Sequence, residues 1–426
     1  MADASTPLLA AEDGHPATLD GAKDGALERS LLLKVDLRLC TIAGILCSLN
    51  LLDSGVISSA SVTSMLSDLD LTGNRFSTWK EMIALQILLG MAMSGVYPGL
   101  SYLISTWYLR SEQQTRYAYM QTGQVIILAT GSIVNFGLNK LNGKAGLAGW
   151  RYMFLVQGTI TIVLGILTYF WMVDFPDQAH NTSWFLTEEE QKLAISRIQL
   201  DRKDAKADPF AWPKVLKHVK DSKVYGFACM FFLLNLVSTS LSYFLPIILR
   251  SGMGFSENAS ILLSAPPYYY AVIPVILTSI IGDRYRIRGP IIVFNCVCLI
   301  IGFCMLGFVD QVTIRYIGAF LATGAYVSNW AALTTYYANN IAGQWKRAFT
   351  AAAVTAMNGA GGVAGSFIVR QSEAPWYPTA IWISIGSHIL IIAFVAASST
   401  WFAMANGRQR AGKTLLEGTE GFRYTL

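Results

Sequence analysis

Chemistry in this sequence is carried by a few polar side chains that interrupt long apolar runs. Asp53 lies within the apolar run of residues 39–62. A carboxylate inside a membrane is energetically costly, and by default such a residue indicates coupling to an ion. An acid near the membrane interface that only caps or pairs is an equal alternative, and both interpretations stay open at this point.

Amide side chains form a second group in the apolar runs. They offer neutral hydrogen-bond donors and acceptors to a polar solute, and for each of them a hydrogen bond between helices is the simpler alternative. The residues of this group are Asn50, Gln86, Gln121, Gln124, Asn235, Asn329 and Asn358. Together with Asp53 they make up the predicted solute and ion pathway.

The other chemically active residue types do not form a catalytic or metal-binding pattern. The six cysteines lie in apolar runs without the spacing of a zinc or redox motif, and the four histidines are scattered. His388 lies in the last apolar run, where a proton relay or, more simply, a structural hydrogen bond would explain it. We therefore expect no enzyme activity, no metal site and no cofactor.

The elements that position these residues are membrane-spanning helices. Hydrophobic residues make up 53% of the chain and charged residues 14%, and the mean hydropathy is +0.42. A span needs about 20 largely apolar residues, because the backbone must satisfy its own hydrogen bonds in lipid. The stretches that qualify are 39–62, 82–108, 117–138, 152–173, 224–249, 261–282, 290–309, 314–337, 348–369 and 379–404. The sequence therefore predicts an all-α integral membrane protein with about ten spans.

Lysine and arginine define the expected orientation, because they accumulate in cytoplasmic loops. With both ends of the chain inside the cell, most of these residues lie on the cytoplasmic side. The expected divisions are a disordered cytoplasmic tail at 1–33, four spans at 34–173, a cytoplasmic linker with an amphipathic helix at 174–222, six spans at 223–405 and a cytoplasmic tail at 406–426. The net charge of +5 reflects this bias, so we expect membrane lipids as partners and no nucleic acid.

Two polar stretches lie next to the predicted spans. The linker stretch "LTEEEQKLAISRI" begins with a capping-box pattern of Thr187 and Glu190, which predicts the start of a helix. The turn "GDRYRIRG" at residues 282–289 places Asp283 beside several arginines in a short cytoplasmic loop. The first half of the chain has no comparable turn.

Several stretches in series resemble one transporter family. They are "KVDLRLCTIAGILCSLNLLDSGVISSA", "LLGMAMSGVYPGLSYLISTWYLRSEQQTR", "LNGKAGLAGWRYMFLVQG", "APPYYYAVIPVILTSIIGDRYRIRGP", "NNIAGQWKRA", "GGVAGSFIVRQSEAPWY" and "GFRYTL". Over about residues 31–426 the sequence is similar to the anion:cation symporter branch of the major facilitator superfamily, and within it to fungal allantoate and nicotinate permease-like proteins. The resemblance implies a helical bundle that moves a small organic solute, a carboxylate-bearing vitamin or nitrogen compound, by alternating access coupled to protons.

The resemblance also bears on the predicted pathway. Asp53 matches the acid of the family's "LDR" stretch, while Ser54 stands in place of its arginine. Gln86 stands in place of another arginine, at the start of the family's fourth span. An anionic solute in a low-dielectric cavity needs a compensating charge or several donors. The neutral amides would therefore have to supply those donors.

The turn at residues 282–289 matches the family's cytoplasmic gating turn through Asp283, Arg284 and Arg288. The resemblance implies that these residues hold one conformational state of the carrier. A basic loop that only sets topology is the alternative.

The chain departs from the family pattern in its first half. The loop "DLDLTGNRFS" runs directly into "TWKEMIALQILLG", which matches the start of the family's fourth span. By this comparison the second and third spans, about 50 to 60 residues, are absent. A truncated, transport-inactive isoform, or the product of a faulty gene model, is therefore the competing hypothesis. It would be retained in the endoplasmic reticulum or associate with full-length carriers, whereas an active carrier is expected in the plasma membrane.

Two glycosylation acceptor sites test the predicted topology. Asn258 in "NAS" is expected outside the cell and Asn181 in "NTS" inside, so only Asn258 should carry a glycan. Expression in a glycosylating host should give a product whose gel mobility changes on glycosidase treatment, and Asn258→Gln should abolish that change. A glycan on Asn181 but not on Asn258 would overturn the orientation.

Overall fold

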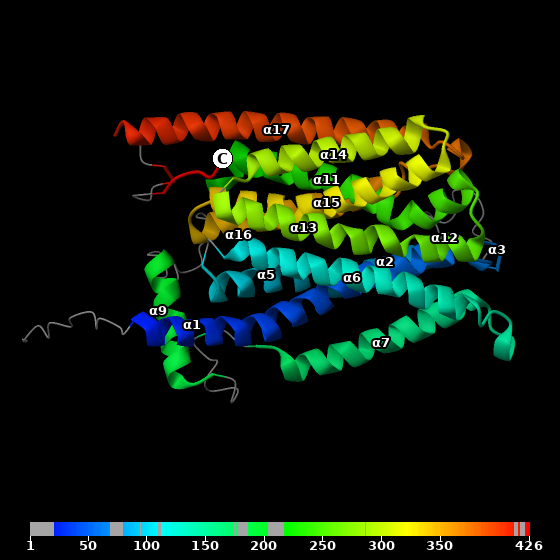
Figure 1. Ribbon diagram of the computed structural model, residues 1–426, viewed down its shortest axis with the longest axis horizontal. Helices are drawn as coiled ribbons and strands as arrows, with labels where there is room; N and C mark the ends of the chain where they lie inside the picture. The colour runs from blue at the N-terminus through cyan, green and yellow to red at the C-terminus, as the bar shows by residue number, and fades with distance from the viewer. Residues whose placement is uncertain are drawn as a thin grey trace, which may run out of the picture.

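The computed structural model describes residues 21–68, 80–93, 95–109, 112–173, 176, 186–202, 217–285, 287–412, 416–417 and 422–426. Most of these residues lie in helices, and most of the long helices run side by side along the long axis of the molecule (Figure 1). A helix satisfies its backbone hydrogen bonds internally, as a membrane span must. The predicted all-α bundle is confirmed.

Two groups of helices follow one another along the chain, joined by a linker. The first bundle contains α1 (Gly21–Val35), the π-helical turn η1 (Asp36–Cys40), α2 (Thr41–Ala60), α3 (Met65–Asp68), α4 (Lys80–Met93), α5 (Val96–Trp107), α6 (Gln113–Asn139), η3 (Lys144–Gly146) and α7 (Gly149–Trp171). The linker contributes α9 (Glu188–Arg202) and η4 (Lys217–Lys220). The second bundle contains α11 (Ser222–Ile247), η5 (Ile248–Gly252), α12 (Glu257–Leu263), α13 (Ala265–Tyr285), α14 (Gly289–Phe308), α15 (Val312–Asn340), α16 (Gln344–Gly365), η6 (Gln371–Glu373) and α17 (Pro378–Arg410).

Different helices lie at the two ends of the molecule. In Figure 1, α1, α9 and the C-terminal residues lie at one end, and α3 and α12 lie at the other. We call these the α9 end and the α12 end. The second bundle fills the upper part of that view from α17 to α13, and α7 forms the lower edge of the first bundle.

Five helical segments in the described part of the chain are long and apolar enough to cross a membrane. They are α7, residues Ser222–Ser242 of α11, the α12–α13 pair, α14 and α17. The remaining predicted spans fall on α2, the α4–α5 pair, α6, α15 and α16. Of these, α15 is buried along most of its length. Small and polar residues suit a helix that packs against other helices rather than lipid, which accounts for its lower hydropathy.

The chain is helical from Gly21, so the prediction of a disordered tail is wrong for residues 21–33; residues 1–20 lie outside the described residues. Leu31 is only 1% exposed and belongs to a buried apolar cluster. Lys34 Nζ lies 2.6 Å from Glu190 Oε1 of α9. Apolar burial and this ion pair hold α1 against the linker helix, and the local composition of the tail does not reveal either contact.

The linker helix begins as its sequence predicts. The Thr187 N–H donates to Glu190 Oε2 at 3.1 Å, and the Glu190 N–H donates to Thr187 Oγ1 at 3.3 Å. This reciprocal capping box supplies partners for groups that the first turn of a helix leaves free. Arg197 on the same helix forms ion pairs with Glu28 of α1 and with Glu112, just before α6. The linker is thereby tied to the first bundle.

Glycines allow close helix packing in the second bundle. A Cβ atom at Gly361 would lie 2.3 Å from the carbonyl oxygen of Phe232, and one at Gly365 would lie 2.4 Å from that of Leu236. These distances are far below van der Waals contact, so α16 reaches α11 at these points only because glycine has no side chain.

Two helices of the first bundle are exposed on more than one face. In α4 every described side chain from Ala84 to Ala92 is exposed. In α7 the buried residues all lie between Gly149 and Gln157, and only 11% of its most apolar stretch of 18 residues is buried. A helix packed against a bundle buries one face along its length. Within the described structure, α4 and the second half of α7 therefore contact the rest of the molecule over little of their surface.

The glycine contact between α16 and α11 gives a stability prediction. Gly361→Ala should destabilise the protein by about 1–3 kcal/mol, because the added methyl group collides with backbone that cannot move freely. Gly359→Ala is the matched control, since a Cβ there meets nothing within 4 Å, and alanine favours the helix. Thermal unfolding of the purified proteins in detergent measures the difference. Equal unfolding temperatures for the two variants would contradict the close contact.

Candidate functional site

The seam between the two bundles is the candidate site. Helices α2 and α6 of the first bundle pack against α11 and α13 of the second along this seam. Figure 1 shows α13, α6 and α2 side by side through the middle of the molecule. Several of their polar side chains meet across the seam, at both ends and between them.

Asp283, close to the end of α13, closes the seam at the α9 end. Its Oδ2 accepts hydrogen bonds from the Thr115 N–H at 3.1 Å and from the Thr115 hydroxyl. Thr115 lies in the first turn of α6, where N–H groups have no partner within the helix. A carboxylate there also complements the positive end of the helix dipole. Asp283 of one bundle thus caps a helix of the other.

Arg288 orients this carboxylate from the turn between α13 and α14. Its side chain is buried, and its Nη2 donates to Asp283 Oδ1 at 2.7 Å. One carboxylate oxygen therefore serves each bundle. Of the three residues predicted for the gate, the structure brings Asp283 and Arg288 together, whereas Arg284 is exposed on the surface of α13.

A second charged cluster supports the capped end of α6 from within the first bundle. Arg116 Nε and Nη2 donate to the two oxygens of Asp36 at 3.2 and 3.1 Å, and the Tyr108 hydroxyl donates to Asp36 Oδ1 at 2.6 Å. The Arg116 guanidinium also lies 4.8 Å from the centre of the Tyr108 ring. Because Arg116 follows Thr115 directly, this cluster fixes the first turn of α6 where Asp283 reaches it.

Further hydrogen bonds connect the bundles along the seam. The hydroxyl groups of Thr130 on α6 and Tyr269 on α13 lie 2.9 Å apart. At the α12 end, Asn139 Nδ2 donates to Glu257 Oε1 at 2.9 Å, and Arg250 Nη1 donates to the carbonyl oxygen of Val62. Polar contacts of this kind can be exchanged for others at small cost, unlike an interdigitated apolar core.

The structure brings together two of the residues predicted for the pathway. Asn235 Nδ2 on α11 donates to the carbonyl oxygen of Asn358 on α16 at 2.8 Å. Asn358 Oδ1 is buried and has no hydrogen-bond partner among the described residues. Within the described part of the chain, one amide oxygen of this pair is thus left without a partner.

The other predicted pathway residues are distributed over separate places. Gln121 and Gln124 are buried on α6, and Asp53 is half-buried on α2. Asn329 of α15 points to α14, where its Nδ2 lies 3.3 Å from the sulfur of Cys296. The side chains of Asn50 and Gln86 lie outside the described residues.

A buried polar chain in the first bundle was missed by the sequence reasoning. Gln157 Nε2 of α7 donates to Asn135 Oδ1 of α6 at 3.0 Å, and Asn135 Nδ2 donates to Ser59 Oγ of α2 at 3.1 Å. Gln157 Oε1 has no partner among the described residues. The signal was the spacing of Gln124 and Asn135, eleven residues apart and hence on one face of the helix.

A membrane bundle in two halves that meet along a polar seam is the architecture of a secondary transporter. The chain belongs to the Major Facilitator Superfamily, whose family model matches residues 53–366.

Among curated proteins, two fungal relatives illustrate the similarity. The chain is 26% identical over 452 residues to the MFS-type transporter cnsO of Penicillium expansum, covering 92% of this chain and 87% of that protein. It is 24% identical over 435 residues to the high-affinity nicotinic acid transporter of Saccharomyces cerevisiae, covering 90% and 80%.

Solved structures share the fold. The proton:xylose symporter XylE bound to a sugar analogue matches with a TM-score of 0.54 at 15% identity, covering 89% of this chain and 87% of that chain. A partially occluded inward-open structure of XylE from E. coli matches with a TM-score of 0.53 at 14% identity, covering 90% of both chains.

The Asp283 cap gives a prediction that can be measured by hydrogen exchange. In Asp283→Asn the charge that complements the α6 dipole is lost, and the amide hydrogens of residues 113–116 should exchange about tenfold faster, since charged hydrogen bonds contribute about 1.5–3 kcal/mol. Asp310→Asn, an exposed acid at the far end of α14, is the matched control. Unchanged exchange in the first turn of α6 would show that Asp283 does not cap it in solution.

Proposed function

We propose that this chain is a proton-coupled secondary carrier of a small organic solute that works by alternating access. The observation that carries the proposal is the Asp283 cap, a charged contact between two bundles that a rocking motion can break and remake. The nicotinic acid transporter among the relatives and the proton:xylose symporter among the structures support solute transport and proton coupling. A carboxylate-bearing vitamin or nitrogen compound is the proposed solute class.

Asp53 is the proposed proton site. It is a half-buried acid on α2, the helix that packs against α11 across the seam. An acid within a membrane span is energetically costly and by default indicates a role in ion coupling, which is the role proposed here. Asn358 Oδ1 and the buried amides of α6 are the proposed neutral contacts for the solute. Arg284 is proposed only as part of the basic turn that faces the cytoplasm.

A second candidate function rests on the exposure of α4 and α7. We propose as the alternative a truncated, transport-inactive form that associates with full-length carriers. The alignments with four fungal relatives extend over 405 to 452 positions but cover 83% to 92% of this chain, so about 50 to 60 positions of each relative lie opposite gaps. That length suits two spans with their loop, and it supports the absence of two helices beside α4 and α7.

The proposed location differs between the two candidates. A carrier would be a multi-pass protein of the plasma membrane with both ends of the chain in the cytoplasm. The truncated form would be retained in the endoplasmic reticulum and degraded. The reason is that helix faces and polar groups normally covered by the missing helices would be exposed to lipid. Sequencing transcripts between the codons for Ser61 and Gly99 separates them: extra codons in every product would assign transport to a longer chain, and an abundant short product would favour the alternative.

Uptake in proteoliposomes tests the carrier proposal. Labelled nicotinate is the probe, and its entry should rise with an inward proton gradient and lose that dependence in Asp53→Asn, which cannot release a proton. Asp310→Asn, whose side chain is exposed at the α12 end, should keep the dependence. Gradient-driven uptake by Asp53→Asn would refute the proton site. No uptake by folded protein, with a full-length carrier co-purifying from its native membrane, would favour the truncated form.

A further inference from the structure

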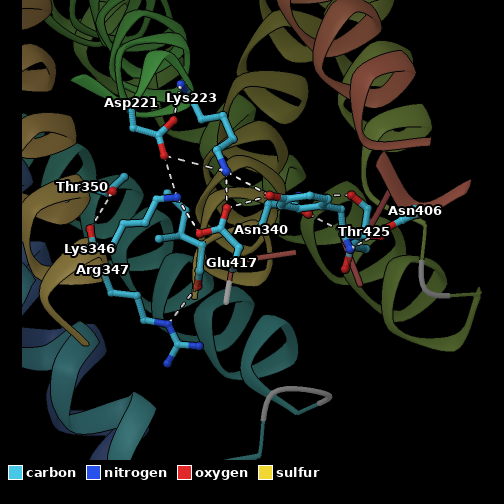
Figure 2. A network of polar contacts seen from close by, with 11 residues as sticks. Asp221, Lys223, Asn340, Lys346, Arg347, Thr350, Asn406, Glu417 and Thr425 are labelled. Atoms are coloured by element: carbon cyan, nitrogen blue, oxygen red, sulfur yellow. Dashed lines mark hydrogen bonds and ion pairs between the residues drawn. The ribbon is translucent and has the colours of Figure 1, made fainter. Parts of the chain in front are cut away.

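The C-terminal segment of residues 422–426, which we call the tail, is docked on the α9 end of the second bundle. The Asn406 side chain of α17 bonds both backbone groups of Tyr424. Its Nδ2 donates to the Tyr424 carbonyl and its Oδ1 accepts from the Tyr424 N–H, each at 2.9 Å. Asn340 at the end of α15 holds Thr425 in the same way, at 3.1 and 2.8 Å. Figure 2 shows both amides with the tail. Each amide thus supplies to the backbone of the tail the donor and acceptor that a neighbouring strand would supply in a sheet.

Aromatic packing reinforces this dock. The Tyr424 ring stacks on Phe402 of α17 with centroids 4.5 Å apart, and both side chains are buried. Lys223 Nζ donates to the Tyr424 hydroxyl at 2.9 Å and lies 5.0 Å from the centre of its ring. The tail is therefore held by backbone bonds, by ring stacking and by a cation.

A cluster of charged side chains connects the docked tail to the first turns of α11 and α16. Glu417 lies between Lys223 of α11 and Lys346 of α16, with Lys346 Nζ at 2.5 Å, and Asp221 lies 2.6 Å from Lys346 (Figure 2). The Tyr424 hydroxyl donates to Glu417 at 2.6 Å. Burial alone would raise the pKa of Glu417, but its bonds from Lys223, Lys346 and Tyr424 hold that pKa below its ordinary value. Two positive and two negative groups balance here, as buried charges require.

The tail also touches the turn that carries the gate. The N–H of Arg288 donates to the carbonyl oxygen of Leu426 at 2.9 Å. A Cβ atom on the next residue, Gly289, would lie 3.5 Å from the Leu426 carbonyl carbon, so the tail lies directly on this turn. The Arg288 side chain in turn holds Asp283, and Asp283 caps α6 across the seam.

A continuous path of contacts thus runs from the tail through Arg288 and Asp283 to Thr115 of the first bundle. We infer that the docked tail is a positioning element for the seam contact: it fixes the backbone of Arg288, and so orients the carboxylate that closes the α9 end. Undocking of the tail weakens the cap on α6 and favours opening at that end. The inference deepens the proposed function, since it rests on the gate role of Asp283.

Hydrogen exchange separates this role from simple stabilisation of the second bundle. Asn406→Ala and deletion of residues 422–426 both undock the tail, and neither change alters a residue of α6. Exchange in residues 113–116 should become about 2- to 10-fold faster, the effect of losing one net hydrogen bond. Tyr316→Phe is the matched control: it removes one hydroxyl–carbonyl bond, of 2.7 Å to Leu263, at the other end of the same bundle. It should leave the first turn of α6 unchanged.

A double-variant comparison completes the test. If the tail acts through Asp283, combining Asn406→Ala with Asp283→Asn should add little to the exchange caused by Asp283→Asn alone. Fully additive effects would overturn the inference, and so would unchanged α6 exchange in a protein whose tail region exchanges faster. The readout needs no transport. Failure of this coupling with normal uptake therefore refutes the tail inference alone, whereas intact coupling without uptake refutes the proposed carrier.

Discussion

The rest of the structure depends on how one carboxylate is shared between two bundles. Asp283 presents one oxygen to Arg288 in its own bundle and the other to the first turn of α6 in the opposite one. In the proposed carrier, a rigid connection would prevent the bundles from moving, and no connection would leave the seam open. Hydrogen bonds from a helix end to a carboxylate lie between these limits, because each is strong when formed and is replaced by water when broken. The packing on either side serves to bring these groups to the right distance.

That packing differs between the bundles. The second bundle is held by close glycine–backbone contacts, by ring stacking and by a balanced charge cluster. In the first bundle, polar chains such as Gln157–Asn135–Ser59 connect α7, α6 and α2, while α4 and the second half of α7 are exposed. The cap on α6 thus joins a well-packed body to a less completely packed one.

Much of the fold could be predicted from the sequence, because apolar runs of span length have few alternatives. The linker helix and its capping box could also be predicted, since Thr187 and Glu190 lie three residues apart. The short polar turn between two apolar runs was enough to predict Asp283 and Arg288. The partner of Asp283, Thr115, could not be predicted, because it lies 168 residues from Asp283 in the chain. Pairings of that range depend on how the bundles meet. The same holds for the Asp36–Arg116 pair, and for residues 21–33, whose helix is held by Leu31 and Lys34 against a distant helix rather than by their own composition.

The length of α17 has a consequence for the surroundings of the tail. Its 33 residues extend about 50 Å, whereas the hydrocarbon core of a bilayer is about 30 Å thick. The last turns of α17, which carry Arg408 and Arg410, have the composition expected of a helix end that lies among lipid headgroups, here at the α9 end. Anionic lipids in that leaflet raise the local concentration of cations and protons. In the proposed carrier, the docked tail and Glu417 would experience the surface potential of these lipids, and the lipid composition of the leaflet would be one of the conditions that set how the seam opens.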